Sequence, residues 1–204
     1  MITIINYGLG NIHAFVNVYK RLNIKTKVAH NAADLKDAKK IVLPGVGAFD
    51  YAINQLNLSG MRDELEKQVI EKKIPIVGIC VGMQILAKSS EEGKLSGLGW
   101  IDGEVKLFNS DLISYKTKLP HMGWNTMKPI KKNIILNGIN DNSRFYFLHS
   151  YYFSCSKNED VVSISNYGIE YASVINRENI FGIQFHPEKS HLNGIQLLNN
   201  FAKL

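Results

Sequence analysis

Hydrophobic positions in the first half of the chain fall into two alternating patterns. Four short runs are almost continuously apolar, as in buried strands, and other segments repeat apolar side chains every three or four positions, as in amphipathic helices. In chain order these are a strand at residues 2–5, a helix at 11–23, strands at 26–29 and 41–43, a helix at 62–73 and a strand at 74–79. This alternation predicts βαβ units around a mostly parallel sheet.

The pattern changes after about residue 99, where strand-like segments at hairpin spacing dominate. They cover residues 104–108, 144–154, 161–165, 171–175 and 180–185, and a last helix is predicted at 194–204. No linker-like tract and no internal repeat separates the two halves. The sequence therefore predicts an α/β fold in a single domain, residues 1–204, with a central mostly parallel sheet flanked by helices and extended by antiparallel strands.

Composition and charge exclude several classes of protein. With 45% hydrophobic and 21% charged residues among 204, the chain has the make-up of an ordinary globular protein. No apolar stretch reaches the roughly 18 residues of a membrane span, and the first residues lack a signal-peptide pattern, so we expect no membrane association and a cytoplasmic location. The net charge of +6 comes from lysines interleaved with acidic residues, so we expect no nucleic-acid binding.

Two glycine-rich segments follow predicted strands. Residues 8–13 (Gly-Leu-Gly-Asn-Ile-His) resemble the start of a dinucleotide-binding fingerprint. However, His13 occupies the third glycine position, and His30 stands where an acidic residue would bind the ribose, so we interpret the segment as a tight turn into a helix. Residues 44–49 (Pro-Gly-Val-Gly-Ala-Phe) could present a backbone N–H to an oxyanion, although a plain loop explains them as well.

The segment 78–82 (Gly-Ile-Cys-Val-Gly) carries the clearest chemical signal. It places Cys80 between two glycines where a central strand meets a helix, which is the arrangement of a nucleophile elbow with sulfur in place of oxygen. Glycines suit this turn because it brings backbone segments close together, and the N–H groups at the helix start face developing negative charge. The alternative is a buried cysteine that packs as a small hydrophobe. Since the other cysteine, Cys155, forms no CxxC pair with it, any cysteine chemistry belongs to one thiol.

A cysteine nucleophile needs a base, and the segment 185–188 (Phe-His-Pro-Glu) offers one. In an extended backbone, positions two apart point to the same side, so Glu188 can hold the imidazole of His186 while the other ring nitrogen faces sulfur. His121 and His149 are rival bases, but neither has an acidic residue two positions away. A structural histidine at a strand end is the alternative for His186.

Taken together, several motifs resemble those of one family. They are residues 6–11 (Asn-Tyr-Gly-Leu-Gly-Asn), 78–84 (Gly-Ile-Cys-Val-Gly-Met-Gln), 120–125 (Pro-His-Met-Gly-Trp-Asn), 149–152 (His-Ser-Tyr-Tyr) and 184–190 (Gln-Phe-His-Pro-Glu-Lys-Ser). In this order they resemble the class I glutamine amidotransferases, which have a flavodoxin-like fold, and among them the glutaminase subunits of imidazole glycerol phosphate synthase. The resemblance spans essentially the whole chain.

The resemblance implies a role for each matching position and requires neither a cofactor nor a metal ion. Cys80 attacks the side-chain amide of L-glutamine, His186 carries the proton and Glu188 orients His186, so that a glutamyl thioester forms and ammonia leaves. Backbone N–H groups of Val46, Gly47 and Val81 are implied for the oxyanion hole. The residues implied to bind glutamine are Gly47, Gln84, Glu92, Ser150 and Tyr151.

The resemblance also implies a partner. Members of the family pass ammonia to a (β/α)8-barrel synthase subunit, which forms imidazole glycerol phosphate and an aminoimidazole carboxamide ribotide in histidine biosynthesis. The positions implied to face this barrel in a heterodimer are Pro120, His121, Met122, Trp124 and Lys189.

Some positions depart from the expected pattern. Val81 replaces the usual leucine after the nucleophile, and Trp100 and Asp102 stand where an aliphatic residue and a proline are more common. These changes leave the glutaminase intact but make a second acceptor possible, a paralogous synthase that builds amidino groups on surface sugars. A non-catalytic regulatory subunit is a third reading, against which the joint presence of Cys80, His186 and Glu188 argues.

Overall fold

The computed structural model describes every residue from Met1 to Leu204. The α-helices are α1 (Ile12–Arg21), α2 (Phe49–Leu58), α3 (Arg62–Glu66), α4 (Val81–Gln84) and α5 (His191–Ala202). The strands are β1 (Ile2–Ile5), β2 (Thr26–Ala29), β3 (Ile41–Gly45), β4 (Ile76–Cys80), β5 (Ser89–Ser90), β6 (Gly103–Leu107), β7 (His121–Thr126), β8 (Lys128–Pro129), β9 (Arg144–His149), β10 (Tyr151–Cys155), β11 (Val161–Tyr167), β12 (Ile169–Arg177) and β13 (Ile180–Ile183). Short 3-10 turns are η1 (Ala32–Leu35), η3 (Ser110–Leu112), η4 (Ile134–Leu136), η5 (Asn158–Asp160) and η6 (Pro187–Lys189), and η2 (Lys67–Glu71) is a π-helical turn.

One eight-stranded sheet, with the order β2-β1-β3-β4-β13-β12-β11-β8, runs through the molecule. Strands β2, β1, β3, β4 and β13 are parallel to one another, whereas β12, β11 and β8 continue the sheet in antiparallel pairing. This confirms the predicted α/β architecture with an antiparallel extension. Strand β13, from the end of the chain, lies directly beside β4 from its middle, so that their carboxyl ends are neighbours.

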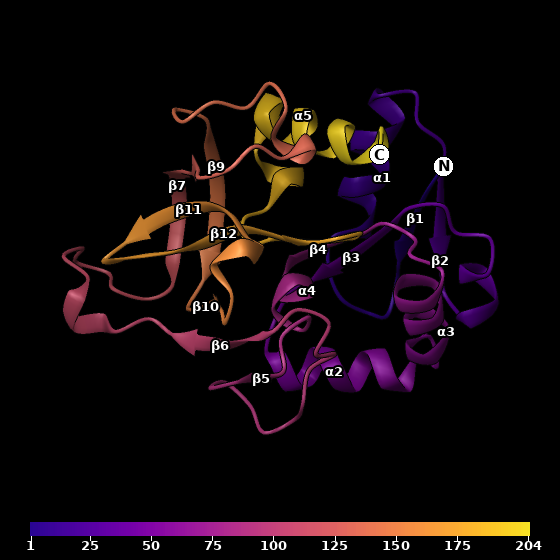
Figure 1. The fold of residues 1–204 in the computed structure, drawn as a ribbon, viewed down its shortest axis with the longest axis horizontal. Coiled ribbons are helices and arrows are strands. Elements are labelled where there is room, and N and C mark those ends of the chain that lie inside the picture. The colour runs from indigo at the N-terminus through magenta and orange to yellow at the C-terminus, as the bar shows by residue number, and fades with distance from the viewer.

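Helices cover both faces of the parallel part of the sheet (Figure 1). In this view α1 and α5 lie above the sheet, and α2, α3 and α4 lie below it. Two small sheets, β10-β6-β5 and β7-β9, stand beyond the carboxyl ends of the parallel strands. This end of the sheet, where α4 follows β4, is the usual place for a site in an open α/β fold.

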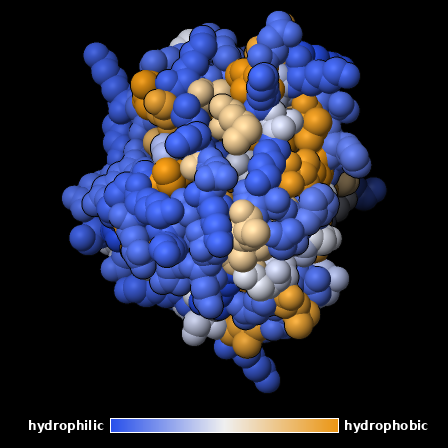
Figure 2. Space-filling view, turned by 90° about the vertical axis from the view of Figure 1, so that its right-hand side faces the viewer, coloured by the Kyte–Doolittle hydropathy of each residue, from blue (hydrophilic) through white to orange (hydrophobic).

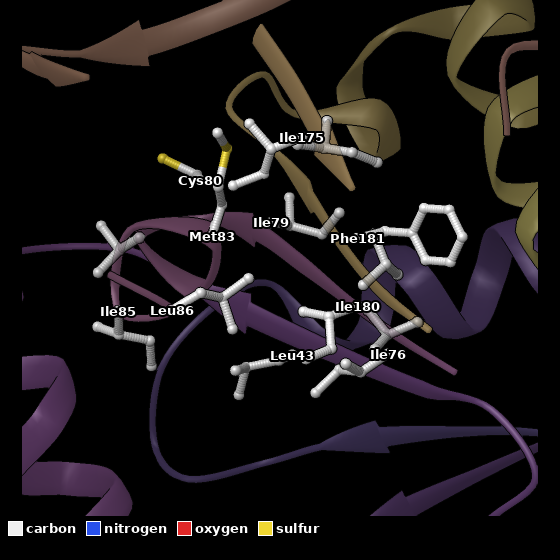
Figure 3. Packing of buried hydrophobic residues seen from close by; sticks show 14 of the residues in the cluster. Leu43, Ile76, Ile79, Cys80, Met83, Ile85, Leu86, Ile175, Ile180 and Phe181 are labelled. Carbon is white, nitrogen blue, oxygen red and sulfur yellow. The ribbon is translucent and has the colours of Figure 1, made fainter. Parts of the chain in front are cut away.

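The core around β4 is apolar on all sides. All five residues of β4 are buried, as expected for a central parallel strand covered on both faces. Figure 3 shows Leu43, Ile76 and Ile180 from three adjacent strands packed together. Cys80 lies at the end of this cluster, and its sulfur points away from Ile76. The core therefore fixes the position of the strand while leaving the thiol at its edge.

The structure differs from the sequence prediction in several elements. The predicted helix 62–73 is a short α3 that continues as the π-helical η2, and the last helix begins earlier than predicted, at His191. The predicted strand 144–154 is two strands that belong to different sheets, because the chain turns at Ser150. Helix α2 and strands β5, β7 and β8 were not predicted, and β13, which was predicted among the hairpin-spaced strands, pairs in parallel with β4.

The surface differs between the two ends of the molecule. The side that carries α3 and β2 is mostly hydrophilic, with apolar side chains in small separate groups (Figure 2). The exposed Met122 and Trp124 belong instead to β7, at the opposite end in Figure 1.

None of the helices is long and apolar enough to cross a membrane.

Helix α5 packs closely against η6, and this contact provides a test of the fold. A Cβ atom added at Gly194 would lie 1.8 Å from the backbone oxygen of Pro187. We predict that Gly194→Ala lowers the free energy of unfolding by about 1–3 kcal/mol through overpacking, although alanine normally favours a helix. Asn199→Ala in the same helix, where no side-chain hydrogen bond is lost, is the control and should be neutral or stabilising. Urea unfolding of both variants measures the effect, and an equal or higher stability of Gly194→Ala would contradict it.

Candidate active site

Strand β4 ends in a sharp turn at Cys80. The backbone of Cys80 has φ 54° and ψ −114°, a conformation that costs free energy for a residue other than glycine. Three glycines permit the close approach of the chain around it. A Cβ atom at Gly82 would lie 2.0 Å from the Leu43 oxygen, and one at Gly78 would lie 2.4 Å from the Gly82 oxygen. At Gly45, a Cβ atom would lie 2.3 Å from the Gly82 nitrogen. The tight turn between strand and helix that the sequence predicts is therefore present.

The thiol of Cys80 is enclosed but borders a pocket. The residue is 3% exposed, and its Sγ lies 3.9 Å from both the Leu148 oxygen and Nε2 of Gln184. His186 lines the same pocket as Cys80 and is 4% exposed. Because little water reaches this thiol, its immediate neighbours decide which protonation state is favoured.

His186 is held in place by hydrogen bonds to Glu188, Tyr146 and Ser190. Its Nδ1 lies 2.9 Å from Oε1 of Glu188, which leaves Nε2 for Cys80. Its backbone N–H donates to the Tyr146 oxygen in β9 at 2.8 Å, and Ser190 Oγ donates to its carbonyl at 2.6 Å. The predicted pair is present, but the predicted extended backbone is wrong, since residues 187–189 form the 3-10 turn η6. The turn brings Glu188 back to the ring instead.

The pKa values separate His186 from the two rival bases. Burial lowers the pKa of His186, but the hydrogen bonds and negative charges of Cys80 and Glu188 outweigh burial and raise it to about 10. Burial lowers the pKa of His121 to about 4 and that of His149 to about 3. The site thus stabilises an imidazolium only at His186. The side chain of Glu188 is 3% exposed, and its Oε2 has no hydrogen-bond partner. His186 is therefore the side chain to which the Glu188 carboxylate is hydrogen-bonded.

The pocket beside Cys80 has a volume of about 270 Å³ and gathers residues from widely separated segments. The predicted residues that line it are Val46, Gly47, Cys80, Val81, Gln84, Glu92, Pro120, Ser150, Tyr151, His186 and Lys189. All residues predicted for the oxyanion hole and for glutamine binding are among them. Glu188 lies behind His186 and does not line the pocket.

Two polar side chains of the pocket are fixed by backbone groups. Glu92 Oε2 accepts a hydrogen bond of 2.8 Å from the backbone N–H of Phe49, at the start of α2. Gln84 is 2% exposed, and its Nε2 donates to the Tyr151 oxygen at 3.0 Å. The pocket therefore offers an oriented carboxylate and an oriented amide, which suit the charged end of an amino acid.

The residues predicted to face a partner do not all lie at the surface. Pro120, Met122 and Trp124 line a groove of about 480 Å³ that adjoins the pocket through Pro120. Lys189 is exposed, with its Nζ 5.6 Å from the centre of the Tyr146 ring. His121 also lines the groove but is only 4% exposed, and its ring stacks on Tyr167 at 4.0 Å.

Sequence reasoning missed two neighbours of the thiol, Leu148 and Gln184. Leu148 contacts it through a backbone oxygen, which no side-chain pattern reveals. Gln184 had a signal, because it is a polar residue at the end of an otherwise apolar strand segment. A polar side chain in such a position is buried at a cost unless it is hydrogen-bonded.

Comparison with known proteins shows the family to which the chain belongs. The family described as glutamine amidotransferase class-I matches residues 3–204. The chain is 53% identical over 204 residues to the imidazole glycerol phosphate synthase subunit HisH of Leptospira borgpetersenii, and the match covers 100% of both chains. It is 46% identical over 205 residues to subunit HisH 2 of Pseudomonas aeruginosa, again with 100% of both chains covered.

Solved structures resemble the fold at much lower sequence identity. A crystal structure of a glutamine amidotransferase superposes with a TM-score of 0.76 at 18% identity, covering 100% of this chain and 98% of the other. The structure of PurLQS from Thermotoga maritima gives 0.74 at 18% identity, covering 99% and 97%. These matches establish the fold, and the sequence matches establish the relationship. The chain belongs to the class-I glutamine amidotransferase family.

Proposed function

We propose that the chain is the glutaminase subunit of an imidazole glycerol phosphate synthase. In this function it hydrolyses L-glutamine and passes the ammonia to a synthase subunit. The observation that carries the proposal is the arrangement of Cys80, His186 and Glu188 at a pocket whose other walls offer an amide and a carboxylate. The similarity to HisH proteins over the whole chain supports the same assignment.

The reaction proceeds by covalent catalysis at sulfur. The proton of the Cys80 thiol is held by His186 as an imidazolium while Sγ attacks the side-chain amide carbon of glutamine, and a tetrahedral oxyanion forms. His186 then donates the proton to the amide nitrogen, the C–N bond breaks, and ammonia leaves a glutamyl thioester. Water attacks the thioester while His186 takes its proton, the C–S bond breaks to release glutamate, and the Cys80 thiolate is left beside protonated His186. Glu188 keeps the imidazole oriented throughout, as the third member of a triad does.

Backbone N–H groups are proposed to bind the oxyanion. One is that of Val81, the first residue of α4, and the other comes from the peptide between Val46 and Gly47. Gly47 has φ +89°, and a Cβ atom added there would meet nothing within 4 Å. Val46 is 41% exposed. This donor therefore belongs to an open surface segment, and a partner bound at the same face can alter its position.

The polar groups of the pocket are proposed to bind the amino-acid end of glutamine. Glu92 is oriented by the start of α2 and supplies a negative charge for the α-ammonium group. Gln84, Ser150 and Tyr151 complete this wall of the pocket. With that end fixed, the side-chain amide is directed toward Cys80.

The groove next to the pocket is proposed as the contact with the synthase. Met122 is 64% and Trp124 39% exposed, and both lie on β7 beside Pro120, which borders the pocket. Exposed aromatic and methionine side chains are common at the centre of protein interfaces. A (β/α)8-barrel subunit bound there would form a heterodimer with this chain and would receive ammonia directly from the pocket. It would use the ammonia to form imidazole glycerol phosphate and the aminoimidazole carboxamide ribotide. His121, behind this surface, supports β7 from inside.

Of the three positions that depart from the usual pattern, Val81 lines the pocket, whereas Trp100 and Asp102 lie away from the pocket and the groove. Trp100 is buried, and Asp102 binds Lys88 at 2.7 Å and Ser156 at 3.1 Å, and neither lines the pocket or the groove. This favours the histidine-pathway synthase over a surface-sugar synthase as the acceptor. The intact triad likewise disfavours a purely regulatory subunit.

Replacement of the nucleophile tests the chemistry. We predict that Cys80→Ala abolishes glutamine hydrolysis in the complex with the synthase, while synthesis from added ammonium salt continues, because only the thioester step is lost. Cys155→Ala is the matched control. Burial raises the pKa of Cys155 to about 12, so its thiol stays protonated and its loss should leave glutamine hydrolysis intact. Hydrolysis by Cys80→Ala at a rate near that of the unchanged protein would contradict the assignment.

Titration of His186 tests the coupling within the triad. Because Cys80 and Glu188 raise its pKa against the effect of burial, Cys80→Ala should shift the His186 titration to lower pH, and so should Glu188→Gln. Because the pKa of His186 is higher in the folded state, protonated His186 stabilises the fold at pH values below its unfolded-state pKa. This stabilisation is lost as the pH rises through the folded-state pKa. NMR of the imidazole nitrogens measures the titration. An unchanged midpoint in both variants would show that neither group acts on His186.

Complementation tests the pathway. A histidine auxotroph that lacks its own glutaminase subunit should grow without histidine when it receives this chain with the barrel subunit of the same organism. Cys80→Ala in the same strain should abolish that growth. If a purified complex hydrolyses glutamine but the strain does not grow, the acceptor is a different synthase.

A further inference from the structure

Two buried glutamine side chains connect the thiol of Cys80 to the wall of the pocket. Gln84 extends from α4 and is 2% exposed, whereas Gln184 follows β13 and is 0% exposed. Gln84 Nε2 lies 3.2 Å from Gln184 Oε1, and Gln184 Nε2 lies 3.9 Å from Cys80 Sγ. The mechanism above gives Gln184 no role, although it touches the reacting atom.

The hydrogen bonds determine which end of each amide faces sulfur. The backbone oxygen of Tyr151 can only accept, so the group 3.0 Å from it must be the NH2 group of Gln84. The second hydrogen of this NH2 group points to Gln184, which must present its oxygen there. The NH2 group of Gln184 is then directed toward Cys80. The backbone carbonyl of Tyr151 thus fixes, through Gln84, the orientation of the Gln184 amide at Cys80.

The position of the chain around Gln184 is also fixed. Its backbone N–H donates to the Ser173 oxygen in β12 at 2.9 Å, one step beyond the last paired residues of β13. The Tyr151 oxygen accepts a second hydrogen bond, from His149 Nδ1 at 2.8 Å. Neither amide can turn without leaving a buried polar group unpaired, which is costly.

We propose that Gln184 donates a hydrogen bond to the sulfur of Cys80 and stabilises its thiolate, and that Gln84 is the positioning residue that holds the Gln184 amide in this orientation. The inference deepens the proposed function and rests on it, because it assumes that Cys80 is the nucleophile. It gives Gln84 a second task beside its place in the pocket wall.

The other neighbour of sulfur explains why a donor is needed. The Leu148 oxygen, also 3.9 Å away, accepts a hydrogen bond from a thiol but repels a thiolate. In a site where Cys80 is 3% exposed, water cannot offset this repulsion. The N–H group of Gln184 favours the charged form of Cys80, as does the imidazolium of His186. Gln184 thereby counteracts Leu148.

The alternative is that the two glutamines only join α4 to β13 and have no effect on reactivity. Stability alone cannot separate these readings, because either one predicts that loss of the pair destabilises the fold. The reactivity of the thiol separates them, since only a donor to sulfur changes the pH at which the thiolate forms.

The experiment is alkylation of Cys80 by iodoacetamide as a function of pH, in the full chain with Cys155→Ala so that a single thiol reacts. Gln184→Met removes the donor and keeps the length of the side chain, and should move the midpoint of the profile upward by about one pH unit, equivalent to about 1.4 kcal/mol. Gln184→Glu, which places a carboxylate beside sulfur, should move it further. Gln84→Met should move it in the same direction by less, because the Gln184 amide remains but can turn.

Gln68→Met is the matched control. Gln68 is also a buried glutamine, 1% exposed, with its Nε2 bound to Glu64 at 2.6 Å, but it lies outside the pocket. Its replacement should lower stability and leave the alkylation midpoint unchanged. In the complex with the synthase, Gln184→Met should reduce kcat about tenfold with a smaller change in KM, because the donor acts on sulfur and not on bound glutamine.

Two results overturn the inference: an unchanged midpoint in folded Gln184→Met, or equal shifts in this variant and in Gln68→Met. If Gln184→Met fails to fold, Gln184→Glu tests the inference instead. A carboxylate next to sulfur must raise the alkylation midpoint, so an unchanged midpoint in this variant would show that residue 184 does not contact sulfur. Failure of the proposed function is a separate result. In that case the midpoints shift as expected, but the unchanged protein does not hydrolyse glutamine with its synthase.

Discussion

The site depends on the backbone turn at Cys80, in which three glycines allow chain segments to touch. A residue with a side chain at φ 54° persists only where its surroundings enforce it. Here the buried strand β4 holds one side of the turn, and the close backbone contacts at Gly45, Gly78 and Gly82 leave no space for a side chain at these positions. The thiol is consequently presented at the edge of the core (Figure 3), where it borders the pocket.

The strand order supplies the remaining groups. Since β13 pairs with β4 in parallel, the chain that leaves β13 carries Gln184 and His186 past the end of β4. Residues of β9 and β10 then close the pocket, and the hydrogen bond from the backbone N–H of His186 to the Tyr146 oxygen holds His186 beside β9. The pairing of β13 with β4, from distant parts of the sequence, thus determines where His186 and Cys80 meet.

The sequence predicted the elements that depend on local patterns and missed those that depend on distant partners. Apolar periodicity located β1, β2, β3, β4 and α1, and the glycines around Cys80 predicted the turn, but the parallel pairing of β13 with β4 was not predicted. The segment 144–154 reads as one strand, because its division at Ser150 depends on two different sheets. The pairing of His186 with Glu188 was predicted from an extended backbone, but a 3-10 turn brings the two side chains together. The burial of His121 follows from aromatic neighbours such as Tyr167. The polar Gln184 at the end of an apolar segment was a signal for a buried polar group, but its contact with sulfur, like that of Leu148, is set by tertiary structure.

The central claim is that Cys80, at this turn, forms the covalent bond to the substrate. The most direct measurement is mass spectrometry of the complex with its synthase after reaction with a diazoketone analogue of glutamine, an electrophile that a nucleophilic thiol traps. The account predicts one adduct, on the peptide that contains Cys80, and protection by excess glutamine. An adduct on Cys155 or on any other residue, together with loss of glutamine hydrolysis, would contradict it.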